Sequence, residues 1–307
     1  MTIMNGAYIN GLDDAGNNAK TTAQAAGTVT TDYILFSLTV LDTTGDICYG
    51  LGGTVVATNG AVTPAAATIL YPVVSAGVTS GQCTRIWLSL GGAGSWTLPN
   101  PTFTNIAKIL AAGGTAATNL VSNLAALATR LKELSGRITA VGFDLDNEDA
   151  AVSAVVPLVV TLYNYGISQS PRVAYPFTFC AFGNDTAWFD ALASVYSGLD
   201  GVQPVVGITL QTYAGGSRQD PAAWTQALAT YLQMHSTGLP SAQGFILPIL
   251  SMDNTAGPTY TPAAMTSKLK SWQSAGGSFW ATQALFQSPP PDKWSDFASA
   301  IASGISS

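Results

Sequence analysis

Short apolar runs rich in β-branched and aromatic residues alternate with longer Ala-rich stretches along most of the chain. The short runs are typical of buried strands, and the Ala-rich stretches repeat their apolar residues at the spacing of a helix. Eight strands are predicted, at 6–10, 33–41, 85–92, 138–146, 172–179, 205–213, 244–251 and 278–285. Helices are predicted at 119–136, 186–198, 221–235, 262–274 and 292–304.

Local signals support several of these helix boundaries. Asp220 before Pro221 is typical of an N-cap followed by a first-turn proline, and Gly136 and Gly198 are typical of C-terminal stops. The first two connections between strands are polar, rich in Gly and Thr, and less clearly helical. Eight strands alternating with helices predict a (β/α)8 barrel, an α/β fold, in which residues 1–307 form a single domain without a separate binding module.

A doubly wound open sheet is the alternative architecture. It would place a Gly-rich phosphate-binding loop directly after the first strand, and no such loop follows residues 6–10. The segment 90–95 contains glycines, but it lacks the G-x-G-x-x-G spacing and the helix start that hold a pyrophosphate. The sequence therefore favours the barrel.

Composition narrows the range of partners. Only 9% of residues are charged, and Lys and Arg are scattered rather than clustered, which argues against binding of nucleic acid. The apolar run 150–163 contains Pro157 and is shorter than the roughly 20 residues of a membrane-spanning helix, so we expect a buried helix and no membrane span. Cys48, Cys83 and Cys180 are too few and too far apart for a disulfide framework or a zinc site, and we expect them in the core or in loops.

Acidic residues gather at the end of the predicted strand 138–146. Because residues at i, i+2 and i+4 of a strand share one face, Asp144, Asp146 and Glu148 are predicted to point together toward the barrel interior and its C-terminal mouth, where such barrels hold their active sites. Their repulsion raises the pKa of at least one carboxyl group, which then keeps a proton for general-acid catalysis. The alternative is a solvated strand end or a helix N-cap cluster, as we expect for Asp149.

Neither a metal nor another cofactor is predicted. The segment 144–149, "DLDNED", resembles the start of an EF-hand calcium loop, but the required glycine and the closing glutamate are absent at their positions.

The same stretch carries a family resemblance. "GFDLDNE", residues 142–148, resembles the strand-four signature D-G-x-D-x-D-x-E of glycoside hydrolase family 18, which contains chitinases and endo-β-N-acetylglucosaminidases. "SLGG" (89–92), "LQTY" (210–213) and "FWATQ" (279–283) resemble further elements of that family in the expected order. The resemblance implies a retaining glycosidase that cleaves β-1,4 bonds next to N-acetylglucosamine by substrate-assisted catalysis, in which the acetamido group of the substrate is the nucleophile.

The resemblance also implies a role for each matched residue. Glu148 takes the position of the general acid and base, and Asp146 the position of the residue that orients the N-acetyl group. Asp144 is implied to support Asp146 by sharing a proton. Tyr213 is implied to hydrogen-bond the acetamido oxygen, and Trp280 to form the apolar floor under the sugar.

Three further side chains are candidates for substrate binding. Trp96 follows a predicted strand at the mouth, Tyr8 lies on the first strand, and Gln211 lies beside Tyr213 within the matched "LQTY". For Tyr8 and Gln211, ordinary hydrogen bonding within the barrel is an equally good interpretation.

Two positions depart from the family pattern. The first aspartate of the signature falls on Val141, so we expect a proton-exchange partner to be missing and the activity to be reduced or its pH optimum shifted. Asn147 replaces an apolar or aromatic residue and is expected to point away from the interior. The competing function is a chitinase-like carbohydrate-binding protein or a structural subunit of a larger assembly.

An aldolase or isomerase barrel is a third possibility, but no lysine falls at the C-terminal end of a predicted strand. We expect an extracellular protein, although residues 1–14 show no signal peptide. The choice between chitin and N-glycan substrates, endo or exo action, the secretion route and the oligomeric state stay open.

Overall fold

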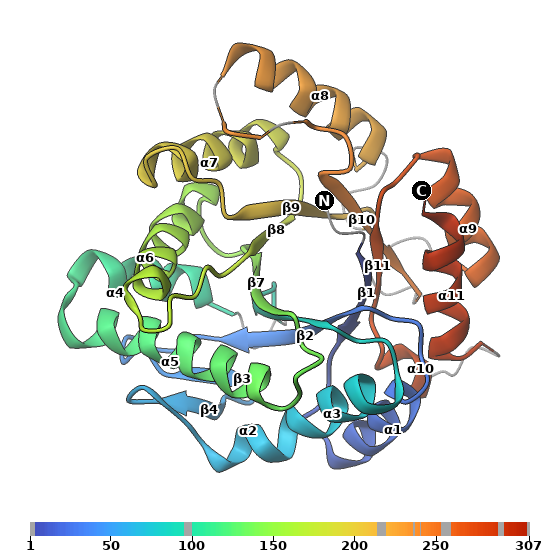
Figure 1. Ribbon diagram of the computed structural model, residues 1–307, viewed down its shortest axis with the longest axis horizontal. Helices are drawn as coiled ribbons and strands as arrows, with labels where there is room; N and C mark the ends of the chain where they lie inside the picture. The colour runs from blue at the N-terminus through green and yellow to red at the C-terminus, as the bar shows by residue number, and fades with distance from the viewer. Residues whose placement is uncertain are drawn as a thin grey trace.

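Eight parallel strands close into a barrel at the centre of the computed structural model, with helices around it (Figure 1). The structure describes residues 4–94, 100–213, 219–235, 237–239, 241–252, 259–287 and 292–305. The barrel strands are β1 (Asn5–Ile9), β2 (Asp32–Thr39), β6 (Arg85–Gly91), β7 (Ala140–Asp146), β8 (Phe177–Ala181), β9 (Val205–Gln211), β10 (Ile246–Ser251) and β11 (Gly277–Trp280). Because β1 pairs with both β2 and β11, the sheet is closed, and the predicted (β/α)8 barrel is confirmed.

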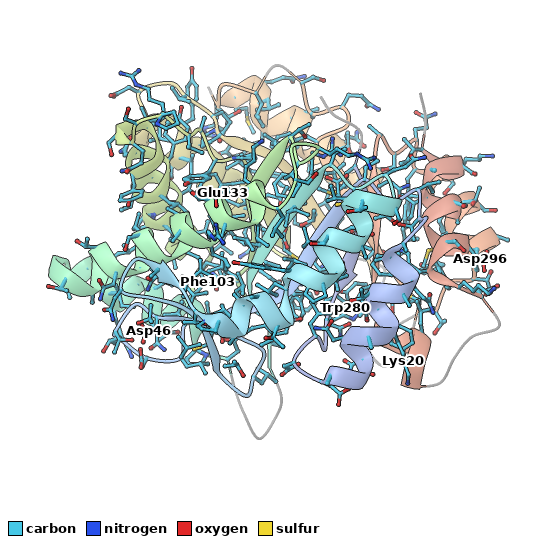
Figure 2. The ribbon with its side chains drawn as sticks, turned by 60° about the horizontal axis from the view of Figure 1, so that its bottom comes forward. Lys20, Asp46, Phe103, Glu133, Trp280 and Asp296 are labelled. Atoms are coloured by element: carbon cyan, nitrogen blue, oxygen red, sulfur yellow. The ribbon has the colours of Figure 1, made fainter. Side chains whose placement is uncertain are left out.

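The helices cover the outside of this barrel. They are α1 (Ala15–Ala25), α2 (Pro64–Ile69), α3 (Tyr71–Ser80), α4 (Thr102–Ala112), α5 (Gly114–Glu133), α6 (Val155–Ser168), α7 (Asp185–Gly198), α8 (Pro221–Met234), α9 (Pro262–Ser271), α10 (Ala284–Gln287) and α11 (Trp294–Gly304), with a 3-10 turn at Val152–Ala154. Figure 2 is turned so that the helices at the bottom of Figure 1, among them α1 with Lys20, come forward. The Asp220 carboxylate accepts a hydrogen bond from the Ala222 amide at 2.8 Å, which confirms the predicted N-cap of α8.

The apolar run 150–163 forms the 3-10 turn and most of α6. Leu158, Val159 and Leu162 of α6 are buried against the barrel, so this is a packed helix of the outer layer. In the part of the chain that the structure describes, no helix combines the length and the apolarity needed to cross a membrane.

The second connection contains an extension that the sequence did not predict. Strands β3 (Ile47–Tyr49), β4 (Thr54–Thr58) and β5 (Ala61–Val62) continue the sheet from β2 in antiparallel fashion. The buried Asn123 of α5 holds this extension, because its amide donates to the Gly45 carbonyl at 2.8 Å and accepts from the Gly60 amide at 2.7 Å. The turn between β3 and β4, with Leu51, thereby reaches the C-terminal mouth.

The alternation of side chains along the strands builds two cores. Val141, Phe143 and Leu145 of β7 face the helices and belong to the large outer core. A smaller cluster fills the barrel itself and includes Tyr8 and Cys180. The outer face of each strand therefore packs against the helices, and only side chains of the inner face reach the C-terminal mouth.

Candidate active site

Three acids follow the inner face of β7 from the barrel interior to the solvent. Asp144 is fully buried, Asp146 is 4% exposed, and Glu148, two residues beyond the strand, is exposed. The structure thus places the three predicted acids on one face, as the alternation of side chains along a strand requires.

Four hydroxyl groups surround the innermost acid, Asp144. Thr178 and Thr209 donate to its Oδ1 at 2.7 and 3.0 Å, and Ser89 and Tyr8 donate to its Oδ2 at 2.8 and 3.1 Å. Burial raises the pKa of Asp144, and these four donors oppose the rise. Tyr8 is 1% exposed and lies beneath the mouth, so the structure gives this predicted substrate contact a supporting position under Asp144.

Asp146 and Glu148 are joined by the side chain of Gln211. The Gln211 Nε2 atom lies 3.0 Å from Asp146 Oδ1 and 2.8 Å from Glu148 Oε1. Burial raises the pKa of Asp146 well above its usual range, and the neighbouring charges of Glu148 and Asp144 raise it further. The thiol of Cys180 lies 3.6 Å from the same Nε2 atom and forms part of the wall below this pair. The pair therefore favours retention of a proton.

A pocket of about 340 Å³ opens above this pair. Its lining includes Asp146, Glu148 and Gln211, three aromatic residues (Phe36, Tyr213 and Trp280), Leu51, Ser37 and the segment 91–94. The Tyr213 and Trp280 rings are stacked, with centroids 6.2 Å apart, and the Phe36 ring meets Trp280 edge-on at 4.5 Å. Tyr213 is 7% exposed and Trp280 is half-buried, so the indole forms more of the accessible wall. Acids beside aromatic faces suit a sugar ring, which has polar edges and apolar faces.

Two glycines of "SLGG" let β6 approach the acidic strand. Gly91 has φ of 104°, and a Cβ atom there would lie 2.1 Å from the Asp146 carbonyl oxygen. The Gly92 amide donates to that carbonyl at 2.8 Å. The glycines thus fix the backbone of Asp146 from the neighbouring strand.

Val141 does not face the acids. Its side chain is 6% exposed and packs in the outer core with Phe143, on the opposite face of β7 from Asp144. An aspartate at position 141 would point at the helices, so the expectation that a proton-exchange partner of Asp144 is missing there is wrong.

The two residues that flank Glu148 have structural contacts. Asn147 turns away from the interior, as predicted, and its amide donates to the Ala151 carbonyl at 3.0 Å. The Asp149 carboxylate accepts from the backbone amides of Phe103 and Thr104, at 3.0 and 2.8 Å. Asp149 therefore caps the first turn of α4, which confirms its predicted role as a helix-capping acid.

No family model matches the sequence, and no curated protein matches it. Solved structures do match. A chitinase of glycoside hydrolase family 18 from Cycas revoluta, solved as a variant in complex with (GlcNAc)4, has a TM-score of 0.64 at 10% identity, covering 97% of this chain and 99% of its own. A chitinase-like agglutinin from Robinia pseudoacacia has a TM-score of 0.56 at 10% identity, covering 98% and 99%. The spore cortex-lytic enzyme SleL from Bacillus cereus has a TM-score of 0.59 at 12% identity, covering 99% and 74%.

The chain has the fold of the family 18 chitinases. This family 18 fold includes both an enzyme with a bound chitin oligomer and an agglutinin, so the fold alone leaves the activity to be argued from the site.

Several residues of the site were not predicted from the sequence. Phe36, Thr178, Thr209 and Cys180 were missed as site residues, and Cys180 was expected only as a core or loop residue. A usable signal existed, because Thr178 and Cys180 alternate with Phe177 and Phe179 in an otherwise apolar strand. Trp96 lies outside the described residues, so its contact with substrate stays a prediction.

Proposed function

We propose that the protein is a retaining glycoside hydrolase that cleaves β-1,4 bonds next to N-acetylglucosamine in a chitin-type glycan. The observation that supports this most strongly is the row of acids that ends at an exposed Glu148, joined through Gln211 to the buried Asp146, in a pocket walled by Trp280. The fold of chitinases with bound N-acetylglucosamine oligomers agrees with this choice of substrate.

In the proposed reaction, Glu148 gives its proton to the glycosidic oxygen as the bond to the anomeric carbon breaks. The carbonyl oxygen of the substrate's own acetamido group forms the new bond to that carbon, which is the substrate-assisted route to retention. Water then attacks the anomeric carbon, the bond from that carbon to the acetamido oxygen breaks, and the water gives a proton to Glu148, which restores the acid. Two displacements on one carbon return the original configuration.

Asp146 is proposed to accept the acetamido N–H and so to hold the acetamido group against the anomeric carbon. Its position one step inward from Glu148 on the same face suits this task. Trp280 is proposed to lie under the sugar ring, and the hydroxyl of Tyr213 to bind the acetamido oxygen. Because an insoluble polymer does not enter cells, we place the reaction outside the cell.

A carbohydrate-binding protein without turnover is the alternative, alone or as a subunit of a larger assembly. The likeness to the Robinia agglutinin, over nearly the whole length of both chains, favours it. The intact row Asp144, Asp146 and Glu148 opposes it, because recognition alone does not need a proton donor at the mouth.

The deciding experiment is hydrolysis of fluorogenic N-acetyl-chitooligosaccharides of several lengths between pH 4 and 8, with Glu148→Gln as the variant. We expect Glu148→Gln to lower kcat by about 10²- to 10⁴-fold and to leave oligosaccharide binding intact. Asp149→Asn is the matched control, because it changes the adjacent acid, which caps α4, and we expect the kcat of this variant to stay within about twofold of the wild type.

Each outcome has one meaning. Binding without turnover by the wild-type protein would support the carbohydrate-binding alternative. Neither binding nor turnover would contradict the proposed substrate, and equal losses in Glu148→Gln and Asp149→Asn would contradict the role of Glu148.

A further inference from the structure

We propose that Gln211 is a positioning residue that holds Asp146 and Glu148 as one pair, so that the proton of the site stays between these two acids and does not pass to Asp144. The inference rests on the proposed function for its catalytic meaning, but the arrangement itself can be measured without turnover. It differs from the sharing between Asp144 and Asp146 that the family resemblance implies.

The geometry of the Gln211 side-chain amide supports the inference that this residue holds Asp146 and Glu148 as one pair. A glutamine NH2 group has two hydrogen atoms to donate, and two carboxylate oxygens lie within hydrogen-bond distance of Gln211 Nε2, at 3.0 Å for Asp146 and 2.8 Å for Glu148. Gln211 is 3% exposed, so water does not compete for these hydrogens. The amide does not titrate, so it can orient both acids without exchanging a proton with either.

The hydrogen bonds that Asp144 already accepts support the inference that the proton does not pass to this residue. A carboxylate has about four lone-pair sites, and four hydroxyl groups already donate to Asp144: those of Tyr8, Ser89, Thr178 and Thr209. Among the described residues, no hydrogen bond joins Asp144 to Asp146. A proton moving from Asp146 to Asp144 would have to displace one of the four donors.

Among the residues that the structure describes, none of the groups that shift the pKa of Asp146 is a cation. Asp146 is faced by Glu148 and Asp144 on its own side of β7, by Cys180 from β8, by Tyr213 after β9 and by Tyr8 from β1, and all of these are neutral or acidic. Gln211 is thus the neutral donor that offsets the repulsion between the two carboxylates. Without it, ionisation of Asp146 beside Glu148 becomes less favourable, and the pKa of Asp146 rises further.

The test compares Gln211→Met with Gln203→Met. Methionine has nearly the length and volume of glutamine, so Gln211→Met removes the two hydrogen bonds with little change in packing. Gln203 precedes the same strand at its other end, where its amide donates to the carbonyls of Leu192 and Thr237 at 3.0 and 3.2 Å. Its Oε1 atom also accepts from the Val205 amide at 3.3 Å, so the control variant loses three hydrogen bonds but does not touch the acids.

The primary readout is the ¹³C NMR titration of the Asp146 carboxyl carbon, assigned with Asp146→Asn. We expect Gln211→Met to raise the pKa of Asp146 by about one unit, with the Asp144 signal unmoved and with no shift in Gln203→Met. Gln211→Asn, whose amide is one methylene too short to reach both acids, should also raise the pKa of Asp146. An unchanged Asp146 titration in Gln211→Met, or a shift of Asp144 instead, would overturn the inference.

The second readout is the alkaline limb of the pH profile of kcat/KM, which we expect to move upward in Gln211→Met and to stay in place in Gln203→Met. If the wild-type protein shows no hydrolysis, the proposed function fails, and the NMR titration still decides the role of Gln211. If the wild type hydrolyses the substrate and the limb does not move, only the role of Gln211 fails.

Discussion

The two ends of the barrel interior both bury aspartates, but they balance them in different ways. At the N-terminal end, Asp32 of β2 is paired with a cation, because Arg85 Nε donates to its Oδ1 at 2.5 Å and Trp87 Nε1 donates to the same atom at 2.9 Å. At the C-terminal end, the groups of the described residues that donate hydrogen bonds to Asp144 and Asp146 are hydroxyls, the Gln211 amide and the Cys180 thiol, all of them neutral. Asp32 and Asp144 are both fully buried, so burial does not distinguish them.

The buried aspartates at the two ends of the barrel differ in how readily they can bind or release a proton. A buried carboxylate beside a guanidinium has its charge neutralised in place, and that pair acts as a tie between β2 and β6. Buried carboxylates that face one another and neutral donors stay close to gaining or losing a proton. A buried aspartate therefore holds two strands together at the N-terminal end of the barrel, and at the C-terminal end it is suited to bind and release a proton.

The largest expected effect comes from breaking the tie at the N-terminal end. Arg85→Met would leave Asp32 as an uncompensated buried charge, and we expect the free energy of unfolding to fall by about 3 to 5 kcal/mol, measured by urea denaturation at pH 7. The folded fraction should hydrolyse substrate at the wild-type rate. The double variant Asp32→Asn/Arg85→Met should recover much of the loss, since it removes both charges. A double variant as unstable as the single one would show that the charge of Asp32 is not the cause.

A smaller loss is expected when an acid is added on the wrong face of β7. Val141→Asp restores the signature of the resembled family but buries a carboxylate in the outer core, so we expect a loss of about 2 to 4 kcal/mol in unfolding free energy and no gain in turnover. Val141→Thr, which has nearly the same shape and no charge, serves as the control and should lose less. A faster enzyme or a shifted pH optimum in Val141→Asp would mean that position 141 does communicate with Asp144.

The position of Val141 separates the features that the sequence predicts from those that it does not. Periodicity along single strands predicted all eight barrel strands and the shared face of Asp144, Asp146 and Glu148, because alternation is a local property of the backbone. The same alternation already places Val141 on the other face, so that error came from the family signature and not from the pattern. The run 172–179 predicted a strand, but β8 begins at Phe177, after Pro176.

The parts that could not be predicted depend on closure of the barrel. β7 and β9 are separated by β8 in the sheet, so no strand-pairing rule joins Gln211 to Asp146 or Thr209 to Asp144. These side chains meet only because a closed barrel turns its inner faces toward one another. The extension β3 to β5 was missed for another reason: its strands are at most five residues long and lie among glycines and threonines.

At the C-terminal end, we expect a stabilising change that removes function. The raised pKa of Asp146 means that the folded state binds a proton that the unfolded state releases, so unfolding free energy falls as pH rises from the ordinary aspartate pKa toward the raised one. Asp146→Asn has no such proton to bind. Its unfolding free energy should match that of the wild type near pH 4. At pH 7 it should be higher than that of the wild type by about 1 to 2 kcal/mol.

Thermal or urea unfolding at several pH values measures this gap, and hydrolysis assays should show lower turnover in the same variant. A gap of constant size across pH would assign the stabilisation to packing rather than to the proton.

The smallest expected effect separates two adjacent acids. Asp149 lies next to Glu148 in the chain, but its carboxylate bonds the amides of Phe103 and Thr104 and caps α4. Asp149→Ala should lower the unfolding free energy by about 1 kcal/mol, as loss of a helix cap does, and leave kcat/KM and its pH profile unchanged. Glu148→Gln should do the opposite, because Glu148 is exposed and its bond to Gln211 can persist with a neutral side chain. If Asp149→Ala moved the pH profile, the division between structural and chemical acids would not hold even at neighbouring positions, and the charge of Asp149 would have to be counted with the pair that Gln211 joins.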